Sequence, residues 1–227
     1  GDMYVGVGGY PWAANTNPAN RGVGTLRLNT TGSLAATGLV NIARNGAGTM
    51  LIDSGTFSCN ELWIGQGASA TGITSISGGA IVTNNWTIIG RESGNGTLNM
   101  TGGTLTKNGG GRFIVADNAT GAMNMSAGTV SVNDEFWVGQ GGSSNGIVTQ
   151  SGGTISCNSW VAIGRDGGTG VYNMTGGTFN KTGGGSNFIV GASGPGTMTM
   201  SGNSLLNVTG GITWIGENNA ATFTMSA

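Results

Sequence analysis

The chain has 227 residues, of which 48 are Gly and 7% are charged, whereas about 25% of the residues of an ordinary globular domain are charged. Eight basic and nine acidic side chains give a net charge of −1, which excludes the basic excess on which nucleic-acid binding depends. The absence of His excludes His-based catalytic triads and His zinc sites, and no apolar run is long enough to cross a membrane.

A unit of about 25 residues repeats along the chain. A small residue follows a short apolar strand at intervals of 22 to 27 residues, at Ala43, Gly65, Gly90, Ala116, Gly139, Gly164, Gly191 and Gly216. Turn residues keep the same period at Gly55, Gly79, Gly103, Gly128, Gly153, Gly177 and Asn203. Two independent markers with one period indicate a repeat protein.

The first and last units differ from the rest. Residues 10–21, which include Tyr10, Pro11 and Trp12, form an insertion in the first unit, and we interpret it as a loop that covers the first coil or contacts a ligand. The last unit stops partway, at Thr224 to Ala227, without a polar cap. Because repeat proteins need capped ends, we expect this chain to be part of a longer polypeptide.

Each unit contains three short strands with alternating apolar and polar residues. Around Gly103 these are residues 86–89, 97–100 and 104–106. Such short, widely spaced runs cannot pair with their neighbours in sequence, but each can pair with its equivalent one unit later. The predicted fold is therefore all-β, a single right-handed parallel β-helix over residues 1–227, with about eight coils and a length of about 40 Å.

Apolar residues recur at the positions that would face inward. Eight of the nine Met residues fall in two neighbouring columns, which we interpret as a ladder of flexible side chains filling a narrow core rather than a metal or redox site. A third inward column contains Phe57, Ile81, Leu105, Val130, Ile155, Phe179 and Leu205. Cys59 and Cys157 share one column but lie about four coils apart, beyond disulfide reach, so both are expected to be free thiols.

Five of the six Trp residues alternate with inward apolar residues and are therefore predicted to face water on one sheet. Trp63, Trp137 and Trp214 fall in one column, and Trp86 and Trp160 fall in the next. A large exposed apolar patch of this kind is typical of a binding surface, and flat indole rings suit the CH-rich faces of sugars. Packing against a neighbouring domain is the alternative interpretation.

A longer repeat of 74 residues, or three coils, is superposed on the first. It relates Trp63 to Trp137, Trp86 to Trp160, Gln66 to Gln140, Arg91 to Arg165, Lys107 to Lys181 and Gly109 to Gly183. Polar residues beside the Trp strands can hydrogen-bond sugar hydroxyls. The candidate ligand-binding residues are therefore Trp63, Trp86, Trp137, Trp160, Trp214, Gln66, Arg91, Gln140, Arg165, Glu61 and Glu135.

Catalysis is the less favoured interpretation, although many β-helix proteins are polysaccharide lyases or hydrolases. The acidic residues Asp117, Asp134, Asp166, Glu92 and Glu217 are spread over five coils. Asp134 and Glu135 are adjacent, so a strand starting there would point them to opposite faces. We therefore expect no enzymatic activity and no catalytic residue. We also expect no cofactor, and no residue pattern supports a calcium site.

The strand motifs LWIGQG, FWVGQG and TWIGEN and the turn motifs NMTGGTL, NMSAGTV and NMTGGTF, within residues 39–227, resemble Gly-rich β-helix repeats of secreted bacterial proteins. Two groups share this pattern: adhesins with autotransporter-like repeats, and a β-helical carbohydrate-binding module family attached to gut-bacterial xylanases. The paired Trp residues and small size favour the second. This resemblance implies a secreted or cell-surface bacterial module, monomeric and non-catalytic, that binds xylan or a related polysaccharide for a tethered enzyme. A structural stalk or adhesin segment remains the alternative function.

Overall fold

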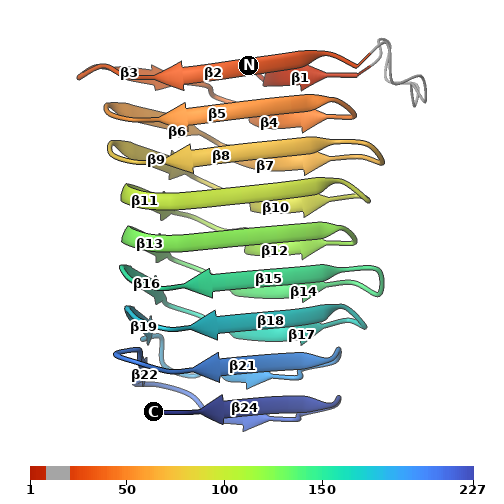
Figure 1. Ribbon diagram of the computed structural model, residues 1–227, viewed down its shortest axis with the longest axis vertical. Coiled ribbons are helices and arrows are strands. Elements are labelled where there is room, and N and C mark those ends of the chain that lie inside the picture. The colour runs from red at the N-terminus through yellow and green to blue at the C-terminus, as the bar shows by residue number, and fades with distance from the viewer. Residues whose placement is uncertain (9–20) are drawn as a thin grey trace.

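The computed structural model describes residues 1–8 and 21–227. These residues form strands and turns without any helix, and the strands stack into a rod of successive coils (Figure 1). No element in the described part of the chain is a helix long and apolar enough to cross a membrane. The predicted insertion at 10–21 lies outside the described residues except for Arg21, which forms an antiparallel bridge with Gly8.

Three flat faces run along the rod, and each coil before the last contributes strand residues to each face. The first face is a nine-stranded sheet made of β1 (Met3–Val7), β4 (Leu39–Arg44), β7 (Glu61–Gln66), β10 (Thr87–Arg91), β12 (Phe113–Asp117), β14 (Phe136–Gln140), β17 (Val161–Arg165), β20 (Phe188–Val190) and β23 (Thr213–Ile215).

The other two faces belong to one continuous 15-stranded sheet. The second face contains β2 (Val23–Leu28), β5 (Ala47–Ile52), β8 (Thr71–Ile76), β11 (Asn95–Lys107), β13 (Thr120–Val132), β15 (Asn145–Gln150), β18 (Thr169–Met174), β21 (Gly196–Met200) and β24 (Ala221–Met225). The third face contains β3 (Ser33–Ala35), β6 (Thr56–Cys59), β9 (Ala80–Thr83), β16 (Thr154–Cys157), β19 (Thr178–Lys181) and β22 (Leu205–Val208), together with the second halves of β11 and β13.

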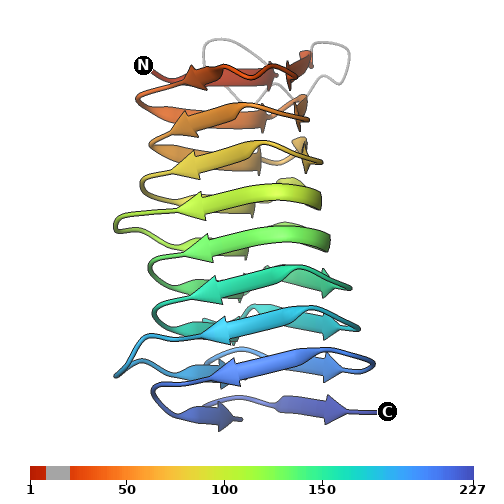
Figure 2. The same ribbon diagram turned by 90° about the vertical axis from the view of Figure 1, so that its left-hand side faces the viewer.

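Every pairing between these strands is parallel and joins equivalent residues of successive coils. Leu62, for example, pairs with Thr87, which pairs with Phe113. Figure 2 shows the coils stacked one above another along the whole rod. The prediction of an all-β parallel solenoid with about eight coils of about 25 residues is confirmed.

Two details of the predicted strands were wrong. The runs expected at 97–100 and 104–106 are joined in the single strand β11, which turns the corner at Gly102 and Gly103 through an irregularity in its register. In the third inward column, Phe179 pairs with Leu206 rather than with Leu205. Leu205 is therefore exposed, because the turn before β22 is longer than its equivalents and shifts the alternation by one residue.

The core between the three faces is filled by ladders of apolar side chains, as predicted. Met100 and Met125 are adjacent in one ladder and both are buried. Phe113 and Phe136 stack in another ladder, with ring centroids 5.2 Å apart. The continuous contact of like side chains along the axis fills the interior of a narrow rod.

One polar pair interrupts the Met ladder. Gln150 occupies the position between Met125 and Met174, and it is fully buried. Its amide oxygen accepts a hydrogen bond of 2.6 Å from the Tyr172 hydroxyl, and its amide nitrogen donates to the carbonyl oxygens of Gly153 and Thr178. These bonds satisfy the two buried side chains, so their polarity is compatible with the core.

The two cysteines occupy the predicted column. Successive pairings run from Cys59 through Thr83, Lys107 and Val132 to Cys157, which places the thiols four coils apart. Both thiols are free and buried, as expected.

The small residue at the end of the first-face strands lies at a close approach between faces, and it is Gly in most coils. At Gly65 the backbone φ is +76°, and a Cβ atom would lie 2.0 Å from the carbonyl oxygen of Asn95. Glycine avoids both the clash and the conformational penalty. The recurrence that identified the repeat therefore marks the turn that leads from the first face to the second.

Candidate functional site

The outward side chains of the nine-stranded sheet form the candidate site, which we call the tryptophan face. Because strand residues alternate, each coil presents an outward residue in a central column. Parallel pairing aligns that column as Asn41, Trp63, Ile88, Ile114, Trp137, Ala162, Ile189 and Trp214. The expected placement of Trp63, Trp137 and Trp214 in one column is confirmed.

A second column lies along the edge of the tryptophan face, just before each strand begins. Ladder hydrogen bonds from Leu62, Thr87, Phe113, Phe136 and Val161 to the next coil fix its order as Glu61, Trp86, Arg112, Glu135, Trp160 and Asn187. Trp86 and Trp160 therefore share this column, as predicted. Each lies one coil after a glutamate, because Glu61 precedes Trp86 and Glu135 precedes Trp160.

The five indole rings differ in their exposure. Trp160 and Trp214 are 37% and 40% exposed, and Trp63 and Trp86 are half-buried. Trp137 is only 4% exposed, so the prediction that all five rings are displayed to water is wrong for this residue. Trp137 packs with Ile88, Ile114, Ala162 and Ile189 in a second small apolar cluster, outside the main core.

Arginine side chains cover two indole rings of the central column, Trp63 and Trp137. The guanidinium of Arg91 lies 4.0 Å from the centroid of Trp63, and that of Arg165 lies 3.9 Å from the centroid of Trp137. These equivalent pairs are separated by 74 residues. Arg112 adds a further contact from the coil before Trp137, at 4.4 Å from its centroid. Each contact has the geometry of a cation–π interaction. The rings of Trp63 and Trp137 are therefore held in place, and their arginine-covered faces are not open for stacking on a ligand.

Two hollows lie on the tryptophan face. One has a volume of about 480 Å³ and is lined by Glu61, Trp63, Trp86, Ile88, Arg91 and Asp117. The other has a volume of about 200 Å³ and is lined by Trp160, Ala162, Arg165, Ile189, Ala192, Ser193, Glu217 and Asn218. Three positions recur in both hollows, because Trp86, Ile88 and Arg91 are equivalent to Trp160, Ala162 and Arg165. Each hollow therefore combines an indole of the edge column, an aliphatic floor and an arginine.

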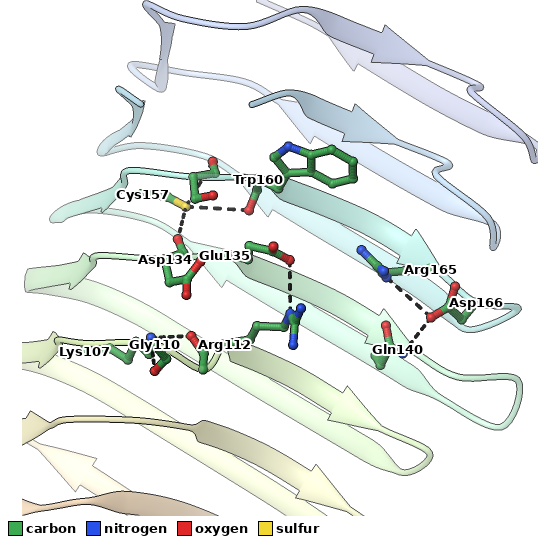
Figure 3. A network of polar contacts seen from close by, with 12 residues as sticks. Lys107, Gly110, Arg112, Asp134, Glu135, Gln140, Cys157, Trp160, Arg165 and Asp166 are labelled. Atoms are coloured by element: carbon green, nitrogen blue, oxygen red, sulfur yellow. Dashed lines mark hydrogen bonds and ion pairs between the residues drawn. The ribbon is translucent and has the colours of Figure 1, made fainter. Parts of the chain in front are cut away.

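The predicted glutamines stabilise the turns beside these hollows. Gln66 is buried, accepts a hydrogen bond from the Asn41 amide and donates one of 2.8 Å to Glu92. Gln140 donates an equivalent bond of 2.8 Å to Asp166 (Figure 3). Gln66 is therefore a supporting residue, whereas the side-chain oxygen of Gln140 has no hydrogen-bond partner among the described residues.

The arginines are tied to the acidic residues of the same turns. Arg91 lies 3.1 Å from Glu92 and 3.8 Å from Asp117, and Arg165 lies 3.4 Å from Asp166. The structure thus brings Glu92 and Asp117 together around one arginine, although the sequence had suggested that the acidic residues were scattered. Burial raises the pKa of Asp117 from its usual range, and Arg91 opposes that effect.

The two predicted glutamates differ in their partners. Glu135 accepts a hydrogen bond of 3.1 Å from Arg112 (Figure 3). Glu61 accepts a hydrogen bond of 3.2 Å from the Asn85 amide, and burial raises the pKa of its carboxyl group. Glu61 lines the larger hollow and is available to a ligand there, whereas Glu135 is committed to Arg112.

Arg112, Ile88 and Ala162 belong to the tryptophan face but were not among the predicted site residues. The sequence carried a signal for each of them. Ile88 follows Trp63 by one coil in the central column, and Ala162 follows Trp137 by one coil. Arg112 follows Trp86 by one coil at the edge. Aligning equivalent positions from coil to coil, starting at Trp63 and Trp86, identifies Ile88, Ala162 and Arg112.

No group of three or more His, Cys, Asp or Glu side chains within residues 1–8 and 21–227 is arranged to hold a metal ion. The face offers instead aromatic rings, aliphatic surface and hydrogen-bonding groups. In comparisons with family models, curated proteins and solved structures, nothing matched this chain. The geometry of the tryptophan face is therefore the basis for its functional interpretation.

Proposed function

We propose that the protein is a non-catalytic module that binds an extended polysaccharide along the tryptophan face, with xylan as the favoured ligand. The observation that carries this proposal is the repetition of an equivalent hollow three coils apart. Trp86 and Trp160 offer partly open indole rings, and Arg91 and Arg165 lie beside them. A linear polymer with a regular repeat is the kind of ligand that can use two equivalent sites along one rod.

The spacing of the hollows supports this choice. Three coils rise by about 14 Å on the spacing of a β-ladder, which is close to the length of three sugar units in an extended chain. Stacking of sugar on indole would supply most of the affinity at each hollow, and the arginines and Glu61 would bond to hydroxyl groups. Two weak sites on one polymer then give a higher apparent affinity than either alone.

In its natural context, the module would hold a tethered glycoside hydrolase close to insoluble plant polysaccharide outside the cell. This proposal follows from the resemblance of the repeats to modules attached to xylanases. It assigns no catalytic residue and no cofactor to the described part of the chain.

Affinity electrophoresis in gels containing xylan, β-glucan or mannan tests the proposal. We expect xylan to retard the native protein and the double variant Trp86→Ala/Trp160→Ala to lose most of the retardation. Val23→Ala is the matched control, because Val23 is an exposed apolar residue on the second face. Absence of retardation by every glycan would contradict the proposal and favour a structural stalk or adhesin segment. Unchanged retardation of the double variant would exclude the tryptophan face.

A further inference from the structure

Both lysines of the sequence, Lys107 and Lys181, are completely buried. They are equivalent residues, 74 positions apart, and each lies at the corner where the chain passes from the third face to the tryptophan face. Lysine is rarely buried without a partner, because removing its charge from water is costly. Neither lysine forms an ion pair with an acidic side chain in the described part of the protein, so other groups must solvate the two ammonium ions.

Backbone carbonyl groups of a glycine loop surround the ammonium of Lys107. Its Nζ donates to the carbonyl oxygens of Gly109 at 2.8 Å, Gly110 at 2.9 Å and Gly111 (Figure 3). In a planar trans peptide, the N–H group points away from the carbonyl group. The N–H groups of Gly110, Gly111 and Arg112 are therefore directed away from the lysine.

These N–H groups have no acceptor among the residues that the structure describes. The outer surface of the loop 108–112 thus presents hydrogen-bond donors, with a buried positive charge behind them. Each peptide dipole has its positive end outward, because the ammonium attracts the carbonyl end. Such a surface favours ligands that carry oxygen acceptors, and favours negatively charged acceptors most.

The loop lies directly beside one of the hollows. A Cβ atom on Gly111 would lie 3.0 Å from Cδ1 of Trp86, and the Arg112 guanidinium lies 5.3 Å from the centroid of that ring. The loop connects β11 to β12, and it projects from the corner of the rod (Figure 2). A group attached to a sugar on Trp86 would therefore meet the loop.

A similar arrangement recurs three coils further on. The Nζ of Lys181 donates to the carbonyl oxygens of Gly183 and Gly210, the latter at 3.1 Å. The loop 182–187 that follows Lys181 reaches Asn187, whose carbonyl oxygen accepts a hydrogen bond from the residue after Trp160. Each of the two edge-column indoles, Trp86 and Trp160, therefore has a lysine-supported glycine loop beside it.

We propose that the loop 108–112, and in the second copy the loop 182–187, bind the carboxylate of an acidic sugar branch while the main chain rests on the adjacent indole. This inference rests on the proposed function and specifies its substrate class as a polysaccharide with uronic acid branches. The net charge around the first loop is zero, because two cations are matched by two anions: Lys107 and Arg112, and Asp134 and Glu135. Arg112 already pairs with Glu135. Recognition therefore depends on the directed N–H groups rather than on net charge.

The test compares two polymers that differ only in the carboxyl group. One is a glucuronoxylan, and the other is the same polymer after its carboxyl groups have been reduced to primary alcohols. We expect the native protein to bind the acidic polymer about tenfold more tightly, the effect of one charge-assisted contact. Lys107→Met should remove most of this preference. Arg27→Met is the matched control, because it removes a cation on the second face and should leave the preference unchanged.

The native protein alone decides the central question, so the test stands even if Lys107→Met fails to fold. Equal affinity for the two polymers would overturn the proposal that an acidic branch is recognised, and it would leave the proposed function intact. No affinity for either polymer would overturn the acidic branch and xylan as the ligand, and no affinity for any glycan would overturn the proposed function as well. If Lys107→Met folds and retains the full preference, the loop is not the site. Amide hydrogen exchange at Gly110 and Gly111, slowed by the acidic polymer only, would support it.

Discussion

The guanidinium of Arg165 lies over the indole of Trp137 at 3.9 Å from its centroid, and Trp137 is 4% exposed as a result of this and neighbouring contacts. This ring, predicted as a binding platform, is instead part of an apolar cluster that stabilises the sheet from outside. The more accessible ring of Trp160, one coil later, belongs to the edge column. We therefore expect Trp137 to serve stability and Trp160 to serve the proposed binding.

The first prediction follows from this division. Trp137→Ala should lower the free energy of unfolding by about 3–5 kcal/mol, because it empties a buried aromatic site. Trp160→Ala should lower it by about 1 kcal/mol or less, because that ring is partly in water. Urea unfolding followed by circular dichroism measures both values. Equal destabilisation by the two substitutions would contradict the assignment of separate roles.

The sequence was sufficient to predict the fold because its period is strict. The small residues at the turns recur once per coil, the Trp pairs recur every three coils, and parallel pairing converts these periods directly into a rod. The membership of the Trp columns could be predicted for the same reason. The exposure of Trp137 could not be predicted, because it depends on how far the long Arg112 and Arg165 side chains reach across neighbouring coils.

The role of the lysines could not be predicted from the sequence either. Lys107 and Lys181 fall at an inward position of a strand, where the pattern predicts apolar residues. Their ammonium groups donate hydrogen bonds to carbonyl oxygens of irregular glycine loops. The direction of these carbonyl groups follows no periodic sequence pattern. The shift at Leu205 has a related cause, because one longer turn alters the alternation of the strand that follows it.

The second prediction concerns the polar pair in the Met ladder. Gln150→Met or Tyr172→Phe alone should each destabilise the protein by about 1–3 kcal/mol, because each leaves a buried partner without its hydrogen bond. The double variant should be less destabilised than the sum of the two, since no orphaned partner remains. A double-mutant cycle from urea unfolding measures the coupling. Strictly additive values would show that the bond of 2.6 Å does not couple the two side chains.

The third prediction concerns thiol reactivity. Burial raises the pKa of Cys59 to about 12 and that of Cys157 to about 11, so neither forms the reactive thiolate at neutral pH. A colourless aromatic disulfide reagent that releases a coloured thiol should report no reaction in the native state. In denaturant, it should report both thiols. Rapid reaction of either thiol in the native protein would contradict the observed packing.

The fourth prediction concerns pH. The pKa of Asp117 is raised above its unfolded value, mainly by burial, so its contribution to stability is complete below the unfolded pKa and is lost as pH rises through the folded pKa. The melting temperature of the native protein should therefore increase relative to that of Asp117→Asn as pH falls from about 7 to about 4. Thermal unfolding at several pH values measures this difference. A difference that shrinks with falling pH would show that the Arg91 ion pair dominates over burial.

The last prediction uses the distance between the two hollows. If one polymer chain contacts Trp86 and Trp160 together, affinity should depend on whether the oligosaccharide can span three coils, which rise by about 14 Å. Oligosaccharides too short to reach both hollows should bind equally weakly to the native protein and to Trp160→Ala. Longer ones should bind the native protein more tightly, because the second contact forms at a high effective concentration, and Trp160→Ala should abolish that gain. Calorimetric titration with xylo-oligosaccharides of increasing length measures both. A smooth increase with length that is the same in the two proteins would mean that the hollows act separately and that the three-coil repeat has no role in binding.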